Sequence, residues 1–399
     1  MWRRTLHCGE ITSFLMEQEE QVYQKYNSFV GIKHKGSGGL AVLGRLRELR
    51  DRLVDIRLTD YQIDIVTRAC DSALGNGLQE EVSPFKLHDY VIEEMLKLSD
   101  EELPRYLFYR YRYEVLPQQK ILDYFPPCVQ IEPASICNYR CVFCYQTDSK
   151  FTDLKNGHMG MMPLELFKEA VDQLEGRCEA VALASRGEPL INRHFEDMLD
   201  YAKDKFLAFK INTNAWFLDE KKSHAILEAG VNTLVISADA ASEPLYSQLR
   251  VHGKLQRVVD NVTKFQEIRR KYYPESKIIT RVSGVKVAED QTLNDMGSLW
   301  GNLVDQVAFV AYNPWENTYQ RPINRLTTPC SDLWRRTFVW FDGTVNPCDV
   351  DYKSTLAVGS VKTGTIESIW QNERYSKLRE DHLKKQRNSV YPCNRCTLV

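Results

Sequence analysis

The chain of 399 residues is 43% hydrophobic and 27% charged, which excludes disorder and fibrous repeats as descriptions of the whole chain. Its 52 Lys and Arg residues nearly balance 54 Asp and Glu residues, so the formal net charge of −2 gives no general attraction to nucleic acid or to an anionic membrane. No uncharged apolar run is long enough for a transmembrane helix, and the first residues lack the apolar stretch of a secretory signal, so we expect a cytoplasmic protein with no nucleic-acid or membrane partner.

Residues 1–125 are predicted to form an N-terminal helical region of unknown role. Apolar residues recur at three- and four-residue steps within 39–60, and again after Ser83-Pro84, where we expect a helix to begin. The tract Gly36–Gly39 indicates a flexible break. The Met and aromatic stripes of this region are typical of a helical core, and we identify no residue in it with a chemical role.

Residues 126–318 are predicted to form an α/β domain, because short β-branched runs alternate there with amphipathic stretches. Six strands separated by helices imply a parallel sheet, open or partly closed, whose ligands bind in the loops after the carboxyl ends of the strands. The strands are expected at 128–132, 180–184, 208–213, 233–237, 278–282 and 306–310, and the helices at 164–174, 195–205, 220–228, 256–272 and 291–303.

Three of the eleven cysteines lie close together, directly after the first of these strands. Cys137, Cys141 and Cys144 are separated by three and then two residues, a clustering that favours metal or redox chemistry over disulfides in an unexported chain. Structural zinc sites use four ligands, usually as two separated pairs, whereas three thiolates can hold three irons of a 4Fe–4S cluster and leave the fourth iron open. The alternative is a reduced cysteine-rich loop or incidental zinc.

The Cys-x-x-x-Cys-x-aromatic-Cys pattern of this loop resembles the signature of the radical S-adenosylmethionine (radical SAM) superfamily. The resemblance implies a partial (β/α)6 barrel in which the open iron binds S-adenosylmethionine. It further implies that one electron from the cluster cleaves this cofactor to methionine and a 5′-deoxyadenosyl radical, which abstracts a hydrogen atom from the substrate. Phe143, between the second and third cysteines, is expected to lie against the adenine.

Turns after successive predicted strands also resemble motifs of this superfamily. Arg186-Gly187-Glu188-Pro189 is similar to its Gly-Gly-Glu-Pro turn, 212–215 to Thr-Asn-Gly, and 237–240 to Ser-Leu-Asp-Ala, while 246–250 matches Tyr-x-x-x-Arg. Arg186 replaces a glycine, and this arginine either pairs with a carboxylate or phosphate at the site or points to solvent. Ala215 replaces a second glycine. The resemblance implies cofactor contacts at Phe143, Gly187, Glu188, Pro189, Asn212, Asn214, Ser237, Asp239 and Arg281.

Residues 319–399 carry a second cysteine set. A hairpin with Gly343 at its turn, followed by a Cys-x-x-Cys pair, resembles the C-terminal extension of the SPASM/Twitch subgroup, and a helix is expected over 367–382. Four cysteines fit the shorter Twitch version, which implies one auxiliary 4Fe–4S cluster suited to electron transfer, although spacing alone leaves zinc open. The four expected ligands are Cys330, Cys348, Cys393 and Cys396. The scattered cysteines are expected to be small buried hydrophobes: Cys8, Cys70, Cys128 and Cys178.

The leading hypothesis is a radical SAM oxidoreductase that dehydrogenates a small polar substrate, such as a carbohydrate, an aminocyclitol or a nucleotide sugar, with the auxiliary cluster as electron acceptor. This reaction class follows by analogy from single-auxiliary-cluster members of the subgroup. The alternatives are a peptide-modifying maturase and a non-catalytic zinc or electron-carrier protein. The expected partners are the small-molecule substrate and an electron donor such as flavodoxin or ferredoxin. Candidate catalytic residues are Arg281, Glu316 and Asp349, and candidate substrate contacts are Tyr145, Arg186, Tyr312, Trp315, Glu316 and Arg335.

Overall fold

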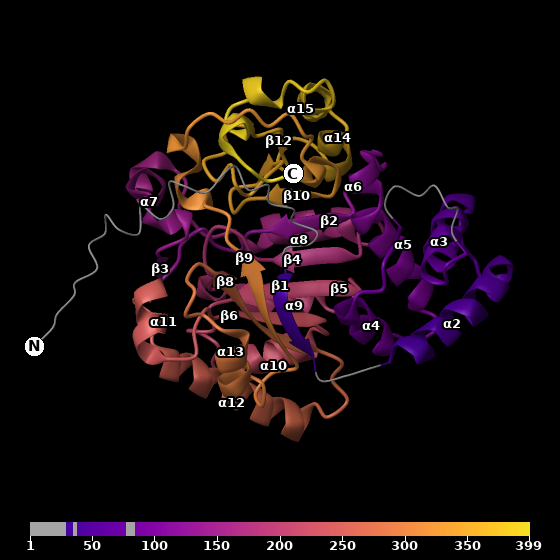
Figure 1. Ribbon diagram of the computed structural model, residues 1–399, viewed down its shortest axis with the longest axis horizontal. Helices are drawn as coiled ribbons and strands as arrows, with labels where there is room; N and C mark the ends of the chain where they lie inside the picture. The colour runs from indigo at the N-terminus through magenta and orange to yellow at the C-terminus, as the bar shows by residue number, and fades with distance from the viewer. Residues whose placement is uncertain (1–28, 35–37, 77–83) are drawn as a thin grey trace, which may run out of the picture.

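The computed structural model describes residues 29–34, 38–76 and 84–399 (Figure 1). Ten of the strands in this part form one sheet, in the order β1-β9-β8-β6-β5-β4-β2-β10-β11-β12. The expectations for Cys8, Gly36, Ser37 and Ser83 lie outside the described residues. The strands of the sheet are β1 Phe29–His34, β2 Cys128–Ile131, β4 Ala180–Leu183, β5 Ala208–Thr213, β6 Thr233–Ser237, β8 Ile279–Lys286, β9 Gln306–Ala311, β10 Arg336–Val339, β11 Thr344–Asn346 and β12 Gly359–Ser360.

The centre of the sheet is parallel. Every neighbouring pair from β9 to β10 in this order runs parallel, and the six strands predicted from β-branched runs all belong to this section. The predicted α/β fold with a parallel sheet is therefore confirmed. A separate two-stranded ladder joins β3 Arg140–Cys141 to β7 Arg250–Val251.

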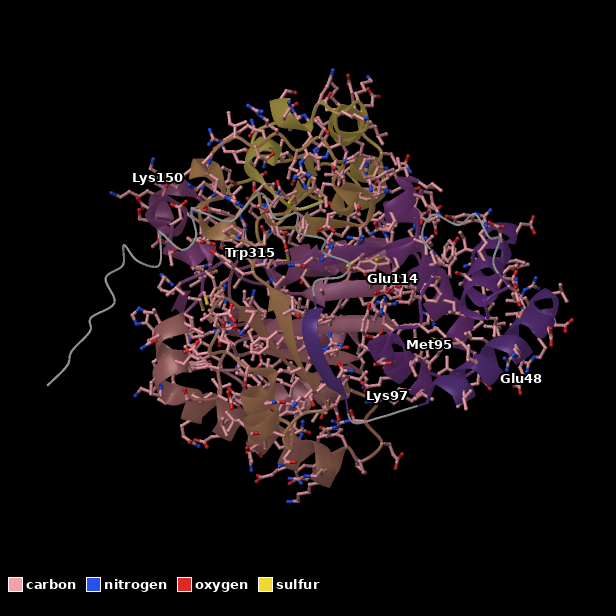
Figure 2. All side chains as sticks on the ribbon, viewed as in Figure 1. Glu48, Met95, Lys97, Glu114, Lys150 and Trp315 are labelled. Carbon is pink, nitrogen blue, oxygen red and sulfur yellow. The ribbon has the colours of Figure 1, made fainter. Side chains whose placement is uncertain are left out.

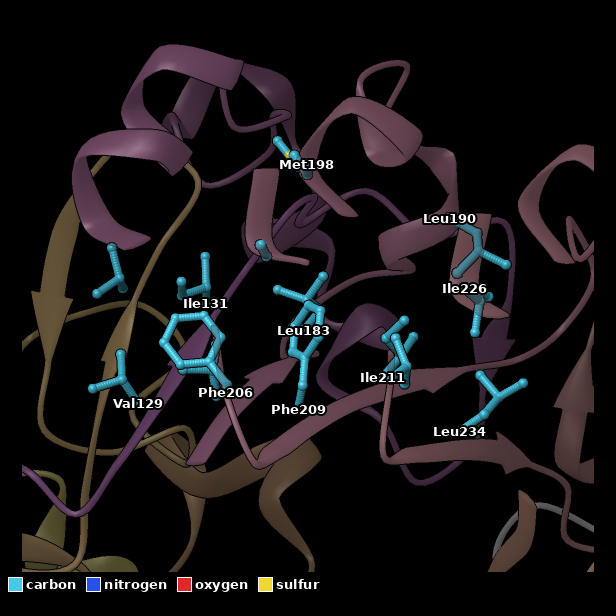
Figure 3. Close-up of a cluster of buried hydrophobic side chains, with 14 of the residues drawn as sticks. Val129, Ile131, Leu183, Leu190, Met198, Phe206, Phe209, Ile211, Ile226 and Leu234 are labelled. Atoms are coloured by element: carbon cyan, nitrogen blue, oxygen red, sulfur yellow. The ribbon is translucent and has the colours of Figure 1, made fainter. Parts of the chain in front are cut away.

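Alternation along the parallel strands separates two faces of the sheet. One face carries large apolar side chains such as Ile131, Leu183 and Ile211, which pack in the main hydrophobic core (Figure 3). The other face carries small or polar residues, including Ala182 and Lys210, that line a cavity. The helices between and after these strands are α7 Ser149–Thr152, α8 Leu164–Leu174, α9 Phe195–Ala202, α10 Glu220–Glu228, α11 Glu243–Leu249, α12 Leu255–Tyr272 and α13 Leu293–Trp300.

The N-terminal helices pack around a core of their own, beside one end of the strands (Figure 1). This core includes Cys70 and reaches Cys128 and Ala180, the first residues of β2 and β4. Cys178 is buried in the main core, so three of the four scattered cysteines are buried as expected. The helices are α2 Gly39–Arg52, α3 Asp60–Ala73, α4 Asp89–Leu96, α5 Leu103–Glu114 and α6 Leu116–Gln119.

One segment of the N-terminal region corrects the helical prediction. Phe29–His34 is a strand that pairs antiparallel with β9, and Lys33 Nζ donates a hydrogen bond to Asn294 Oδ1 at 2.9 Å. Without β1, one side of β9 would present unpaired backbone groups at the edge of the sheet. The local pattern did not indicate this pairing because it depends on a strand almost three hundred residues away.

The C-terminal region continues the same sheet, since β10 pairs in parallel with β2 and in antiparallel with β11. Gly343 has φ +88° in the β10–β11 turn, a left-handed conformation that favours glycine. The single helix expected over 367–382 is instead two helices, α14 Ile366–Trp370 and α15 Glu373–Leu383. They separate because the Asn372 side chain accepts the Tyr375 N–H and caps the second helix.

No helix in the described ranges combines the length and the apolar character that a membrane span requires.

Candidate active site

The inward face of the sheet encloses a cavity of about 550 Å3. At one end it is lined by the three clustered cysteines, which follow the carboxyl end of β2, and at the other end by Tyr106, Tyr109 and Arg110 of α5. Trp315 and Glu114, which line the cavity toward these two ends, are labelled in Figure 2. The helical N-terminal region therefore forms the wall of the cavity that is opposite the cysteine loop.

The cysteine loop is held by side chains from neighbouring strands. Cys141 pairs with Arg250 in the β3–β7 ladder, and Arg250 Nη1 donates to its sulfur at 3.8 Å. Asn214 Nδ2 donates to the sulfur of Cys137 at 3.9 Å. Burial raises the pKa of the Cys137 thiol to about 12 and also raises the pKa of Cys141. Binding of iron must therefore release thiol protons, and these donors would then stabilise the resulting sulfur charge.

The donor set of this loop fits an iron–sulfur cluster better than a single zinc ion. Ligands around one zinc ion lie within about 4 Å of one another. Among the described residues, no three His, Cys, Asp or Glu side chains converge closely enough to hold one metal ion. In a 4Fe–4S cluster each thiolate binds a different iron, so the thiolates stand farther apart. Cys137, Cys141 and Cys144 would hold such a cluster at the end of the cavity.

The turn after β4 approaches the backbone of the cysteine loop closely. A Cβ atom on Gly187 would lie 2.5 Å from the carbonyl oxygens of Ala134 and Ile136, so only glycine fits here. The neighbouring Glu188 carboxylate accepts hydrogen bonds from Thr213 Oγ1 at 2.6 Å and from the Asn214 backbone N–H at 2.7 Å. Burial raises the pKa of Glu188 to about 7. Glu188 thus ties this turn to the turn after β5.

Arg186 lines the cavity and has protein partners on its guanidinium group. Its Nη2 lies 2.6 Å from Glu132 Oε1 and its Nη1 donates to the Tyr352 carbonyl at 2.9 Å. Both side chains of this ion pair are fully buried. Glu132 also accepts the backbone N–H of Phe341, so the pair joins the turn after β4 to the C-terminal region. Arg186 therefore pairs with a carboxylate of the protein and does not point to solvent, while its contact with the substrate stays a prediction.

Most of the predicted cofactor contacts line the cavity, and two of them do not. Asp239 is fully buried, forms an ion pair with Arg250 and accepts the Val285 N–H at 2.7 Å, so it positions Arg250. Pro189 begins a short 3₁₀ turn away from the cavity. Arg250 itself lines the cavity, and its place in the Tyr-x-x-x-Arg pattern is the sequence signal that could have identified it. The predicted contacts that do line the cavity are Phe143, Gly187, Glu188, Asn212, Asn214, Ser237 and Arg281.

Some of the other substrate and catalytic candidates line the cavity, and others do not. Tyr145, Trp315 and Asp349 line the cavity. Tyr312 and Glu316 are not in its lining, and the Tyr312 hydroxyl donates to the Glu316 carboxylate.

Arg335 is wrong as a substrate contact. It is fully buried, lies 2.8 Å from Asp332 and donates to the Tyr113 carbonyl at 3.1 Å. Its neighbour Arg336, the first residue of β10, lines the cavity instead.

The four C-terminal cysteines surround a second, small cavity of about 30 Å3. Their surroundings are ordered by His382, whose Nδ1 accepts the Cys330 backbone N–H at 3.1 Å, and by Arg387, which donates to the Cys396 carbonyl at 2.7 Å. Burial raises the pKa of the Cys330 thiol to about 11. Two buried and two half-buried thiols on one cavity fit a fully ligated 4Fe–4S cluster, and the ligands would be Cys330, Cys348, Cys393 and Cys396.

Aromatic side chains connect the two cysteine sites. Tyr145, next to Cys144, stacks on Tyr352 with ring centroids 4.9 Å apart. Tyr352 meets Tyr319 at 4.9 Å, and Tyr319 meets Tyr391, two residues before Cys393, at 5.8 Å. A continuous series of ring contacts therefore leads from the loop of Cys144 to the segment that precedes Cys393.

A model of the radical SAM superfamily matches residues 131–292, and a model of an iron–sulfur cluster-binding domain, SPASM, matches residues 330–397. The chain belongs to the radical SAM superfamily. Its C-terminal region is a SPASM domain. Membership implies S-adenosylmethionine and 4Fe–4S clusters as cofactors, and both cysteine sites fall within the matched residues.

Named relatives are distant. Fe-coproporphyrin III synthase of Methanosarcina barkeri is 28% identical over 107 residues, which cover 27% of this chain and 26% of the synthase. The S-adenosyl-L-methionine-dependent 2-deoxy-scyllo-inosamine dehydrogenase of Niallia circulans is 20% identical over 275 residues, 68% of this chain and 92% of the dehydrogenase. A crystal structure of BtrN in complex with AdoMet and 2-DOIA has 18% identity and a TM-score of 0.47, and the match covers 70% of this chain and 95% of that chain. The chain thus spans about a quarter of the first relative and nearly all of the second.

Proposed function

We propose that this protein is a radical SAM dehydrogenase that oxidises a small polar molecule. The observation that carries the proposal is the cavity, which is lined by the three-cysteine loop at one end and carries charged side chains such as Lys210, Arg281 and Arg336 on its walls. Its volume of about 550 Å3 is in the range of small-molecule sites. The name of the Niallia circulans dehydrogenase, whose length the chain nearly spans, supports the reaction class.

When bound, S-adenosylmethionine and the clusters would supply the radical that abstracts hydrogen and an acceptor for the electron that the substrate then loses. The chain's own residues orient the reactants and exclude water. Asn214 and Arg250 hold the cysteine loop, and Gly187 lets the following turn approach it. Oxidation of a carbinol also needs a group that takes the hydroxyl proton, and Asp349 is our candidate because its side chain comes from the SPASM domain and lines the cavity.

The experiment is anaerobic reconstitution followed by reduction in the presence of S-adenosylmethionine. We expect two clusters, or about eight irons per chain, and formation of 5′-deoxyadenosine. An electron donor such as flavodoxin or ferredoxin would replace the chemical reductant. Cys141→Ala should abolish 5′-deoxyadenosine formation, whereas Cys70→Ala, in the N-terminal core, should leave it unchanged. A fully iron-loaded protein that forms no 5′-deoxyadenosine would refute the proposal.

A further inference from the structure

A lysine without a protein partner lies in the middle of the cavity wall. Lys210 is on the inward face of β5, where the register places it beside Ala182 of β4 and Thr233 of β6. Both neighbours are small, so the space in front of the ammonium group stays open. Within the described part of the chain, the Lys210 ammonium has neither a hydrogen-bond nor an ion-pair partner. It lies four residues before Asn214, which contacts the cysteine loop.

Two arginines from other strands line the same cavity with donors unused. Arg281 of β8 donates from Nε to Gln306 at 2.6 Å, while its Nη2 is buried without a hydrogen-bond partner. Arg336 of β10 donates from Nη2 to the Tyr113 hydroxyl at 2.5 Å, while its Nε is buried without one. The nearest carboxylate to Arg336 is 3.8 Å away on Asp332. Cationic side chains from three strands therefore line one cavity, and none of the three uses all of its donors on protein groups.

Carboxylates in this part of the cavity do not neutralise these cations fully. Glu114 forms an ion pair with Arg110, and Glu94 accepts a hydrogen bond from the Tyr106 hydroxyl at 2.5 Å. Burial, with repulsion from the two arginines, lowers the pKa of Lys210 to about 8. Burying an uncompensated charge is costly, and a bound anion would offset this cost.

We propose that Lys210, Arg281 and Arg336 bind an anionic group, a phosphate or a carboxylate, on the substrate. The inference rests on the proposed function in one respect, namely that the cavity binds the substrate, and it narrows the substrate to a phosphorylated or carboxylated small molecule. Guanidinium groups match the geometry of both anions, and the lysine adds a point charge. The three cations and the cysteine loop line the same cavity. The anion would therefore anchor one end of the substrate, and the rest of the substrate would extend toward the cysteine loop.

The test measures anion binding in the reconstituted, S-adenosylmethionine-loaded protein without reductant. Inorganic phosphate and acetate are the probes, and the thermal midpoint and calorimetric affinity are the readouts. We expect at least one anion to bind and to raise the midpoint. Lys210→Met should weaken that binding by about tenfold or more, since hydrogen bonds to charged groups are strong, and should raise the midpoint of the anion-free protein. Lys210→Arg should keep binding, and Lys264→Met, at an exposed lysine, should change neither readout.

The outcomes separate the possibilities. Stronger binding of phosphate indicates a phosphorylated substrate, and stronger binding of acetate indicates a carboxylated one. The proposal is overturned if neither anion binds, or if Lys210→Met binds it as the parent protein does. Loss of S-adenosylmethionine binding in Lys210→Met would also overturn it, because the cations would then serve the cofactor carboxylate. Should Lys210→Met not fold, Arg336→Gln provides the same comparison. No radical chemistry occurs in this assay, so a failure to bind anions would not contradict the proposed dehydrogenase function. In turn, a failure to form 5′-deoxyadenosine would not contradict anion binding.

Discussion

The buried ion pair between Glu132 and Arg186 connects the parallel sheet to the SPASM domain through hydrogen bonds of both residues. Both side chains are inaccessible, and Arg186 also donates to the Tyr352 carbonyl in the SPASM domain. Glu132→Gln keeps the shape but leaves the guanidinium uncompensated, so we expect the free energy of unfolding to fall by about 3–5 kcal/mol. Urea unfolding of parent and variant, reconstituted and measured side by side, checks this value.

An exposed pair provides the control for Glu132→Gln. Asp64 lies 3.1 Å from Arg68, and the side chain of each residue is 50% exposed. Asp64→Asn should therefore change stability by only about 0–1 kcal/mol. Equal losses in the two variants would mean that the burial of the Glu132 pair has no energetic consequence.

The protonation state of Lys210 sets a pH range for anion binding. Its pKa of about 8 results from burial and from repulsion by Arg281 and Arg336, while Cys128 and Glu94 act in the opposite direction. A bound anion favours the ammonium form and raises this pKa, so affinity is constant below about pH 8 and falls as the pH rises above it. Acetate titrations across this range test the prediction, because acetate keeps a single charge there, whereas phosphate changes its own charge near neutral pH. Lys210→Arg should remove the decline, because arginine stays charged; a decline of equal size in that variant would contradict the assignment.

At the scale of elements, period and composition predict the parallel strands well because each one packs its apolar face on helices, as Ile131 and Leu183 do. β1 was missed because its partner, β9, lies far away in the sequence. The turn at Gly187 follows β4 as its motif predicted, because the close approach to the carbonyl oxygens of Ala134 and Ile136 leaves no room for a Cβ. The roles of Arg186 and Arg335 were not predictable, since their partners Glu132 and Tyr113 come from outside any local pattern.

Helix α2 offers a test of backbone conformation within one element. Gly44 lies inside this helix, and a Cβ added there would meet nothing within 4 Å. Gly44→Ala should stabilise α2 by about 0.5–1 kcal/mol, because glycine loses more backbone entropy on folding than alanine. Hydrogen–deuterium exchange of α2 peptides should slow accordingly. Gly187→Ala is the contrasting variant, since its Cβ would clash with backbone oxygens, and it should lose S-adenosylmethionine binding. Faster exchange in Gly44→Ala would contradict the prediction.

At the scale of the whole molecule, one sheet runs through both matched domains. β10 of the SPASM domain pairs with β2, the strand that precedes the cysteine loop. Contacts between aromatic rings lead from Tyr145 to Tyr391, from one cysteine site to the other. The N-terminal helices close the far end of the cavity, a role that the sequence did not predict because helical periodicity carries no information about which surface a helix covers. The two cysteine sites thus belong to one framework, while their cysteines come from separate loops.

This separation predicts that the two clusters can be lost independently. Cys393→Ala removes one of four thiols from the SPASM site and leaves the loop after β2 intact. Iron content should fall from about eight to about four per chain, because each cluster contains four irons. Formation of 5′-deoxyadenosine should persist, while oxidation of the substrate should stop for lack of an electron acceptor. Cys178→Ala, at a buried cysteine outside both sites, should keep the full iron content. Loss of all iron in Cys393→Ala would show that the shared sheet makes the sites assemble together, and unchanged iron would remove Cys393 from the ligand set.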